Sequence, residues 1–188
     1  EILKDLLRLE LFVQIVEGIF YTWLAFSINS VQNITPKRYA DWFITTPTML
    51  ITFITLLIYL NRKEDMEGIS LIDVIKRHSK TFGTIILLNG LMLIFGLLGE
   101  TGILNNTYAV FIGFIPFIIY FYIIYRDFVR ENSSRKLFFF FFITWSLYGV
   151  FALAPYRIKN IGYNFLDLFS KNLFGILLSY LVFTKSQQ

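Results

Sequence analysis

Residues 163–183 read YNFLDLFSKNLFGILLSYLVF, and this apolar stretch is long enough to cross a bilayer as a helix. Its only charged residues are Asp167 and Lys171. A charged side chain at bilayer depth costs at least about 2.5–3.5 kcal/mol, so a lysine there indicates a functional site. Because residues four apart share a helix face, Asp167 can offset the charge, and a desolvated lysine suits Schiff-base chemistry. A structural ion pair in a transporter or channel is equally consistent with these two residues alone.

The composition places the whole chain in a membrane. Of its 188 residues, 56% are hydrophobic and 19% aromatic, which is too apolar for a soluble domain of this size. We predict an all-α, polytopic transmembrane bundle that forms one domain over residues 1–188, with a short amphipathic segment along the membrane surface within residues 61–80. The predicted spans are roughly residues 6–28, 39–60, 81–100, 106–126, 137–156 and 162–184.

Basic residues predict the orientation, because they accumulate in cytoplasmic connections. With the N-terminus inside, twelve Lys and Arg residues lie on the cytoplasmic side and only Lys37, Arg38, Arg157 and Lys159 lie outside. This bias accounts for the net charge of +4 without a nucleic-acid partner. The chain has no cysteine and a single histidine, so we expect no disulfide and no metal site.

The second predicted span opens with KRYADWFITTP, residues 37–47, a polar and aromatic string at a membrane boundary. Arg38, Asp41 and Thr45 are spaced at i, i+3 and i+7, which places them on one helix face, with Trp42 and Thr46 on an adjoining face. If Asp41 lies opposite the lysine of the last span, the two spans form a site with two anions and two cations.

Four motifs occur in the order in which microbial-type rhodopsins, seven-helix retinal proteins, carry them. RYADW with TTP (residues 38–47) resembles the family's third helix, and NGLM (89–92) followed by Gly96 its fourth. WSLY (145–148) resembles the sixth helix, and DLFSK (167–171) the retinal-bearing seventh. The resemblance covers nearly the whole chain and is closest to viral and channelrhodopsin-like members. It implies that the first span here corresponds to the family's second helix, so we expect the family's first helix to be absent from this chain.

The resemblance also implies roles for individual residues. Lys171 carries all-trans retinal as a protonated Schiff base, Asp41 is the main counterion and proton acceptor, Asp167 is the second counterion, and Arg38 organises the outer side. Flat aromatic walls suit a long conjugated chain, although for each aromatic residue alone, without its motif, core packing is the better explanation. The implied pocket residues are Trp42, Thr46, Met92, Gly96, Trp145 and Tyr148.

A polar stripe on the first span bears on the transport mode. Glu10, Gln14, Glu17 and Tyr21 recur at i, i+4, i+7 and i+11, and carboxylates at membrane depth require water or cations beside them. Channelrhodopsins carry a comparable acidic ladder and an asparagine after the retinal lysine, as at Asn172. Glu17 and Asn172 therefore resemble their central gate. Glu10 alone is equally consistent with a side chain that snorkels to the interface.

Departures from the family's outward pumps favour a channel. Such pumps usually carry a carboxylate eleven residues after the acceptor, where this chain has Thr52, and Asn89 replaces an aspartate that often pairs with the Thr46 position. We predict a light-gated channel for monovalent cations or protons, without enzymatic activity, in a plasma or host-cell membrane. The alternative is an outward proton pump with Glu10 or Glu17 as proton donor, and the third hypothesis is a sensory rhodopsin. A transporter that binds no retinal is the hypothesis that applies if the family resemblance is wrong. A homo-oligomer is compatible with the sequence.

Overall fold

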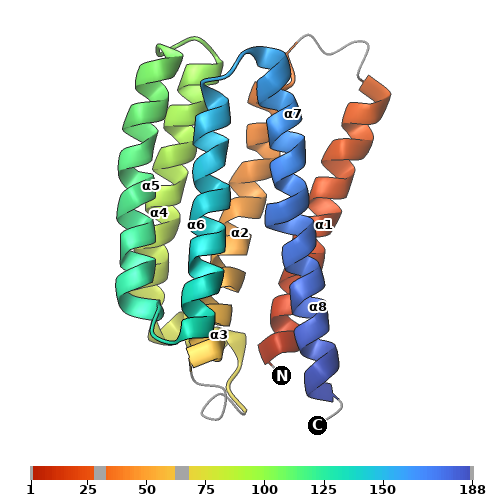
Figure 1. Ribbon diagram of the computed structural model, residues 1–188, viewed down its shortest axis with the longest axis vertical. Helices are drawn as coiled ribbons and strands as arrows, with labels where there is room; N and C mark the ends of the chain where they lie inside the picture. The colour runs from red at the N-terminus through yellow and green to blue at the C-terminus, as the bar shows by residue number, and fades with distance from the viewer. Residues whose placement is uncertain (1, 28–32, 62–67, 187–188) are drawn as a thin grey trace.

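The computed structural model describes residues 2–27, 33–61 and 68–186, and every regular element in that part of the chain is helical. Six helices are long and apolar enough to cross a membrane, and they stand side by side in one bundle (Figure 1). This confirms the predicted all-α polytopic fold. The spans are α1 (Ile2–Ser27), α2 (Thr35–Asn61), α4 (Ser79–Glu100), α5 (Asn106–Phe128), α6 (Asn132–Ala152) and a last span, Tyr156–Thr184.

Some helix ends differ from the predicted spans, because hydropathy marks apolar residues and not the points where a helix begins or ends. The fifth span stops at Ala152, earlier than the predicted 156, and the last span starts at Tyr156 and not at 162. Pro155 lies between them with an extended backbone (φ −54°, ψ 149°). Its ring cannot continue the preceding helix, and it serves instead as the N-cap of the next one. Residues 28–32, which include the predicted end of the first span, lie outside the described residues.

The two chain termini lie at the same end of the bundle (Figure 1). We call the end that holds Ile2, Asn61 and Phe128 the inner end, and the end that holds Glu100 and Ala152 the outer end. The bias of basic residues predicts that the inner end faces the cytoplasm. Helix α4 packs mainly against α5 on one side of the bundle, whereas α1 packs against α2 and α8 on the other (Figure 1).

Helix α2 packs against α1, α4, α5 and α6, so most of its surface is covered by protein. Its polar side chains Arg38, Asp41 and Thr45 are consequently buried inside the bundle, where lipid does not reach them. The ring of Phe53 on α2 stacks on Phe141 of α6 with centroids 4.4 Å apart. Packing of this kind holds α2 in the interior and thereby fixes the direction in which its polar face points.

The last span is interrupted by a π-helical turn. Helix α7 (Tyr156–Asp167) continues into η2 (Leu168–Asn172) and then α8 (Leu173–Ser186), and Lys171 lies within the π turn. Such turns add a residue to the helix and occur frequently at functional sites. The sequence pattern predicted a continuous α-helix here, because nothing in the apolar spacing marks the extra residue.

A short helix, α3 (Leu71–Arg77), lies at the inner end (Figure 1) within the segment predicted to be amphipathic; residues 62–67 of that segment are outside the described residues. Ser70 and Asp73 form a capping box in which each side chain accepts a hydrogen bond from the other residue's backbone N–H. The hydrogen bonds from Ser70 hold the pKa of the exposed Asp73 carboxyl below its ordinary value of 3.8.

Candidate functional site

Lys171 is surrounded by carboxylates from three helices. Its Nζ donates a hydrogen bond to Asp41 Oδ2 at 2.8 Å, and it lies 3.6 Å from Asp167 Oδ1 and 3.7 Å from Glu17 Oε1. All four residues are at most 5% exposed. The structure therefore brings together the three residues expected from α2 and the last span. It adds Glu17, which we had expected at a gate with Asn172.

The two aspartates differ in how fully they are hydrogen-bonded. Asp167 accepts bonds of 2.6 Å from the hydroxyls of both Tyr21 and Tyr148, one on each carboxylate oxygen, and Arg38 lies 3.7 Å away. In contrast, Asp41 Oδ1 has no hydrogen-bond partner among the described residues. Both oxygens of Asp167 are thus hydrogen-bonded, whereas Asp41 has one oxygen beside Lys171 without a partner among the described residues.

Arg38, which is 1% exposed, occupies the outer side of this cluster. Its Nε donates to Asn160 Oδ1 at 3.1 Å, and its terminal nitrogens donate to Asn164 Oδ1 and to the Tyr21 hydroxyl. Asn160 in turn donates to Thr35 on α2. The sequence reasoning missed both asparagines, although Tyr156, Asn160, Asn164 and Asp167 recur at i, i+4, i+8 and i+11, a helical stripe comparable to the one that we described on the first span.

The polar stripe of α1 is divided between two environments. Glu10 is 1% exposed and accepts a hydrogen bond from Gln14, which excludes the interpretation that it snorkels to the interface. Its Oε2 has no hydrogen-bond partner among the described residues. Glu17 and Asn172, expected to form a gate, are not hydrogen-bonded to each other in the described part of the chain; Asn172 is half-buried. The spacing in the sequence predicted that these polar residues share one face of α1, but it did not predict which neighbouring helix each of them faces.

Thr45, the remaining candidate on the polar face of α2, is fully buried, and its Oγ1 donates to the backbone oxygen of Asp41 at 3.0 Å. Its hydroxyl therefore bonds to its own helix and not to a carboxylate. Thr46 behaves in the same way toward Trp42, and also accepts a bond of 2.8 Å from Asn89 on α4.

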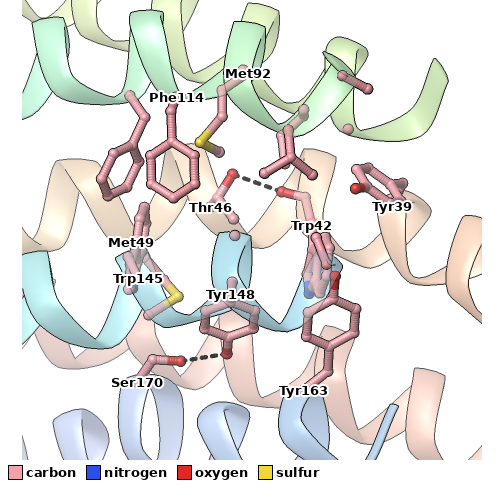
Figure 2. Close-up of a pocket in the computed structure, with 18 of the residues that line it drawn as sticks. Tyr39, Trp42, Thr46, Met49, Met92, Phe114, Trp145, Tyr148, Tyr163 and Ser170 are labelled. Atoms are coloured by element: carbon pink, nitrogen blue, oxygen red, sulfur yellow. Dashed lines mark hydrogen bonds between the residues drawn. The ribbon is translucent and has the colours of Figure 1, made fainter. Parts of the chain in front are cut away.

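A cavity opens beside Lys171 between α2, α4, α5, α6 and the last span (Figure 2). All six residues expected to form a polyene pocket line it. Other residues that line the cavity were not predicted, because nothing in the sequence around them distinguishes a pocket residue from a core residue. They include Tyr39, Phe114, Phe117, Gly149, Tyr163 and Ser170. Gly96 is required by close packing, since a Cβ there would overlap the Tyr39 hydroxyl.

The chemistry of the cavity suits a flat, apolar ligand attached to a lysine. Trp42 and Tyr148 meet edge to face with ring centroids 5.6 Å apart, and the Tyr148 hydroxyl is hydrogen-bonded to Ser170 beside Lys171 (Figure 2). The rings form apolar walls, and the few polar groups gather at the lysine end. An amine held there next to available carboxylate oxygens can carry a proton and release it over a short distance.

Comparison with known proteins identifies the class. A family model described as bacteriorhodopsin-like protein matches residues 3–185, so the chain belongs to this family of microbial-type rhodopsins. It is similar to a solved structure titled "Crystal structure of viral rhodopsin OLPVRII", with a TM-score of 0.85 and 30% identity over 97% of this chain and 83% of that chain. A search among curated protein sequences found no match.

Family membership confirms the predicted resemblance and makes the chain an integral membrane protein of the retinal photoreceptor and ion transporter class, which is typically not enzymatic. The family holds retinal through a Schiff base to a lysine. The residues present here fit that group. Lys171 supplies a buried amine at the end of an aromatic cavity, and Asp41 Oδ1 and Glu17 Oε1 lack hydrogen-bond partners among the described residues.

Proposed function

We propose that this protein is a light-gated cation channel in which the Glu17 carboxylate links the state of Lys171 to ion passage. The observation that carries the proposal is the position of Glu17 Oε1, 3.7 Å from Lys171 Nζ and without a hydrogen-bond partner among the described residues. Glu17 shares a stripe of α1 with half-buried Gln14 and with buried Glu10, whose Oε2 also has no hydrogen-bond partner among the described residues. Buried carboxylate oxygens without hydrogen-bond partners attract water or cations.

Retinal, when bound at Lys171, supplies the light absorption and the isomerisation that reorients the amine end. In the structure, Lys171 Nζ donates a hydrogen bond to Asp41 Oδ2 at 2.8 Å, so Asp41 would hold and accept the proton of this nitrogen when retinal is bound. When that proton moves to Asp41, the lysine nitrogen and Asp41 become neutral together. Glu17 then loses the cation that neutralised it, while Asp167 stays paired with Arg38. A mobile cation can take the place of the lysine charge beside Glu17.

Passage to the outer end requires Arg38 to change partners. Its guanidinium is held by Asn160, Asn164 and Tyr21, and it lies between the Lys171 cluster and the outer end. An immobile, buried cation there opposes the approach of other cations. We therefore assign the dark, closed state to the arrangement described here, with the Glu10–Glu17 stripe leading from the inner half to a closed outer half.

The test is photocurrent against voltage in cells supplied with retinal. A channel's current reverses sign at a potential set by the ion gradients, whereas a pump's current stays outward. In Glu17→Gln the chromophore should assemble normally, but the reversal potential should shift because the charge that selects ions is lost. Glu131→Gln is the matched control, since it makes the same change at an exposed residue of the inner end. A current that stays outward at every voltage would rule out the channel.

An outward proton pump is the second candidate, and the burial of Glu10 favours it. Glu10 is 1% exposed on the inner side of Lys171, with one oxygen unpartnered among the described residues, as a proton donor would be. For a pump, Glu10→Gln should slow the return of the proton to Lys171 in flash photolysis by about 10²-fold or more. For a channel, that rate should change little while the conductance falls.

A further inference from the structure

A second buried lysine lies outside the site described above. Lys159 Nζ donates to Glu100 Oε1 at 2.7 Å, and the two side chains are only 9% and 8% exposed. Glu100 is the last residue of α4, and Lys159 lies in the first turn of α7, so the pair joins two helices at the outer end. From the sequence we expected Lys159 to lie outside the membrane at this end. Arg157, two residues earlier, is exposed there, but Lys159 is buried.

Each member of this pair stands one helical turn beyond a residue that lines the cavity. Gly96 precedes Glu100 by four residues, so the two share a face of α4. Tyr163 follows Lys159 by four residues, so these two share a face of α7. Tyr39 packs on Gly96, and its ring meets Trp42 at 4.9 Å; Trp42 meets Tyr163 at 5.1 Å. This ring cluster forms one side of the cavity (Figure 2). The ion pair therefore lies directly outside the cavity's outer wall.

A buried ion pair adds little net stability to a contact between two helices. Desolvation offsets much of the attraction between the charges, and an apolar pair of the same size is often as stable. Loss of one partner has a larger effect, because it leaves an uncompensated charge in a dry site. Water must then enter to solvate that charge. A pair in this position consequently controls whether the outer wall of the cavity is dry.

We propose that the Glu100–Lys159 ion pair is a clamp that ties α7 to α4 across the outer end of the cavity and excludes water from it. Both are positioning residues: they hold Tyr39 and Tyr163 together and keep the helix that carries Lys171 in register with α4. The proposal concerns the dark protein and holds for a channel and a pump alike.

The test measures how fast hydroxylamine bleaches the retinal-loaded protein in the dark, well below its unfolding temperature. Hydroxylamine reaches the lysine–retinal bond only through water, so the bleaching rate reports hydration of the cavity. Glu100→Gln keeps the size of the side chain but leaves Lys159 without a counter-charge, and bleaching should accelerate about tenfold or more. Lys159→Gln should do the same. In Glu100→Gln/Lys159→Gln the two amides can bond to each other, and the rate should return toward that of the unmodified protein.

Two controls separate a clamp from general stability. Asp5→Asn removes an exposed ion pair with Arg8 and should leave bleaching unchanged. Asn61→Ala removes two bonds that link α2 to the α5–α6 connection at the inner end, so it destabilises the bundle elsewhere. Unchanged bleaching in both single variants overturns the proposal. So does bleaching in Asn61→Ala as fast as in Glu100→Gln at matched melting temperature.

A measurement on the retinal-free protein completes the test. Amide hydrogen exchange should accelerate in the first turns of α7 in Glu100→Gln, with α8 and the inner end unchanged, because the clamp acts at the outer end of α7. If either single variant fails to fold, Glu100→Asp replaces it, because the shorter side chain stretches the ion pair without leaving Lys159 uncompensated. Faster exchange confined to the first turns of α7 then supports the clamp, and unchanged exchange there overturns it.

Discussion

The outer and inner halves of the bundle differ in how their buried polar groups are satisfied. In the outer half, Arg38 and Asp167 are held by asparagine and tyrosine side chains, and Lys159 is paired with Glu100. At mid-depth and toward the inner end, by contrast, one buried oxygen of each of five residues has no hydrogen-bond partner among the described residues: Glu10, Glu17, Asp41, Thr55 and Asn89. Because unsatisfied buried groups draw in water, the comparison supports the proposed closed outer half and a hydrated path from the Lys171 cluster toward the inner end.

The two buried lysines give the largest expected effect. Lys171→Ala should abolish visible absorption after addition of retinal, because no other amine lies at the end of the cavity among the described residues. Lys159→Ala is the matched control and should still form the pigment. Absorption spectra before and after borohydride reduction decide the matter; a retinal adduct trapped in Lys171→Ala would transfer the attachment site elsewhere.

The two aspartates should respond differently to neutralisation. Asp41→Asn removes the anion nearest to Lys171, so the pH at which the visible band is lost should fall by about 1–3 units. The band should also move to the red, because the positive charge is less localised at the nitrogen. Titration of the absorption spectrum measures both.

Asp167→Asn should mainly weaken the protein, since it removes the acceptor of two tyrosine hydroxyls and the partner of Arg38. The melting temperature should fall further than in Asp41→Asn. If the spectral effects of the two variants are exchanged, Asp167 is the main counterion and the contrast drawn between the aspartates is wrong.

A glycine-to-alanine substitution in each half compares how tightly the two halves are packed. Gly96→Ala places a Cβ against the Tyr39 hydroxyl in the outer half, and such overpacking costs typically about 1–3 kcal/mol. At Gly175, a Cβ would lie at ordinary contact distance, 3.5 Å from Glu10 Cγ. There the helix preference for alanine should raise stability by up to about 1 kcal/mol. Thermal unfolding of both variants in one detergent provides the comparison, and equal losses would contradict it.

The smallest effect is expected at α3, outside both halves. The pKa of Asp73 is lowered in the folded protein, so its contribution to the capping box is present above the ordinary value of 3.8 and is lost as the pH falls through the lowered folded value. Protection of α3 amides from exchange should therefore decrease on acidification in that range. Ser70→Ala should remove this pH dependence, and a dependence that persists would assign it to another group.

The sequence by itself determined the approximate spans, the charged residues of the site and the family, because these depend on local properties. Hydropathy sums over neighbouring residues, and the 3.6-residue period shows which side chains share a face. Lys171, Asp41, Asp167 and Arg38 were all found in this way or by the motifs that contain them. The six expected pocket residues likewise line one cavity.

Only the tertiary structure decided which helix each face meets. Glu17 lies beside Lys171 and not Asn172, Tyr148 donates to Asp167 as well as lining the cavity, and Glu100 reaches Lys159 across 59 positions. The π turn that carries Lys171 also left no trace in the apolar spacing. These features depend on the rotation and packing of whole helices against one another. That arrangement is a property of the entire bundle, and no periodicity within one segment encodes it.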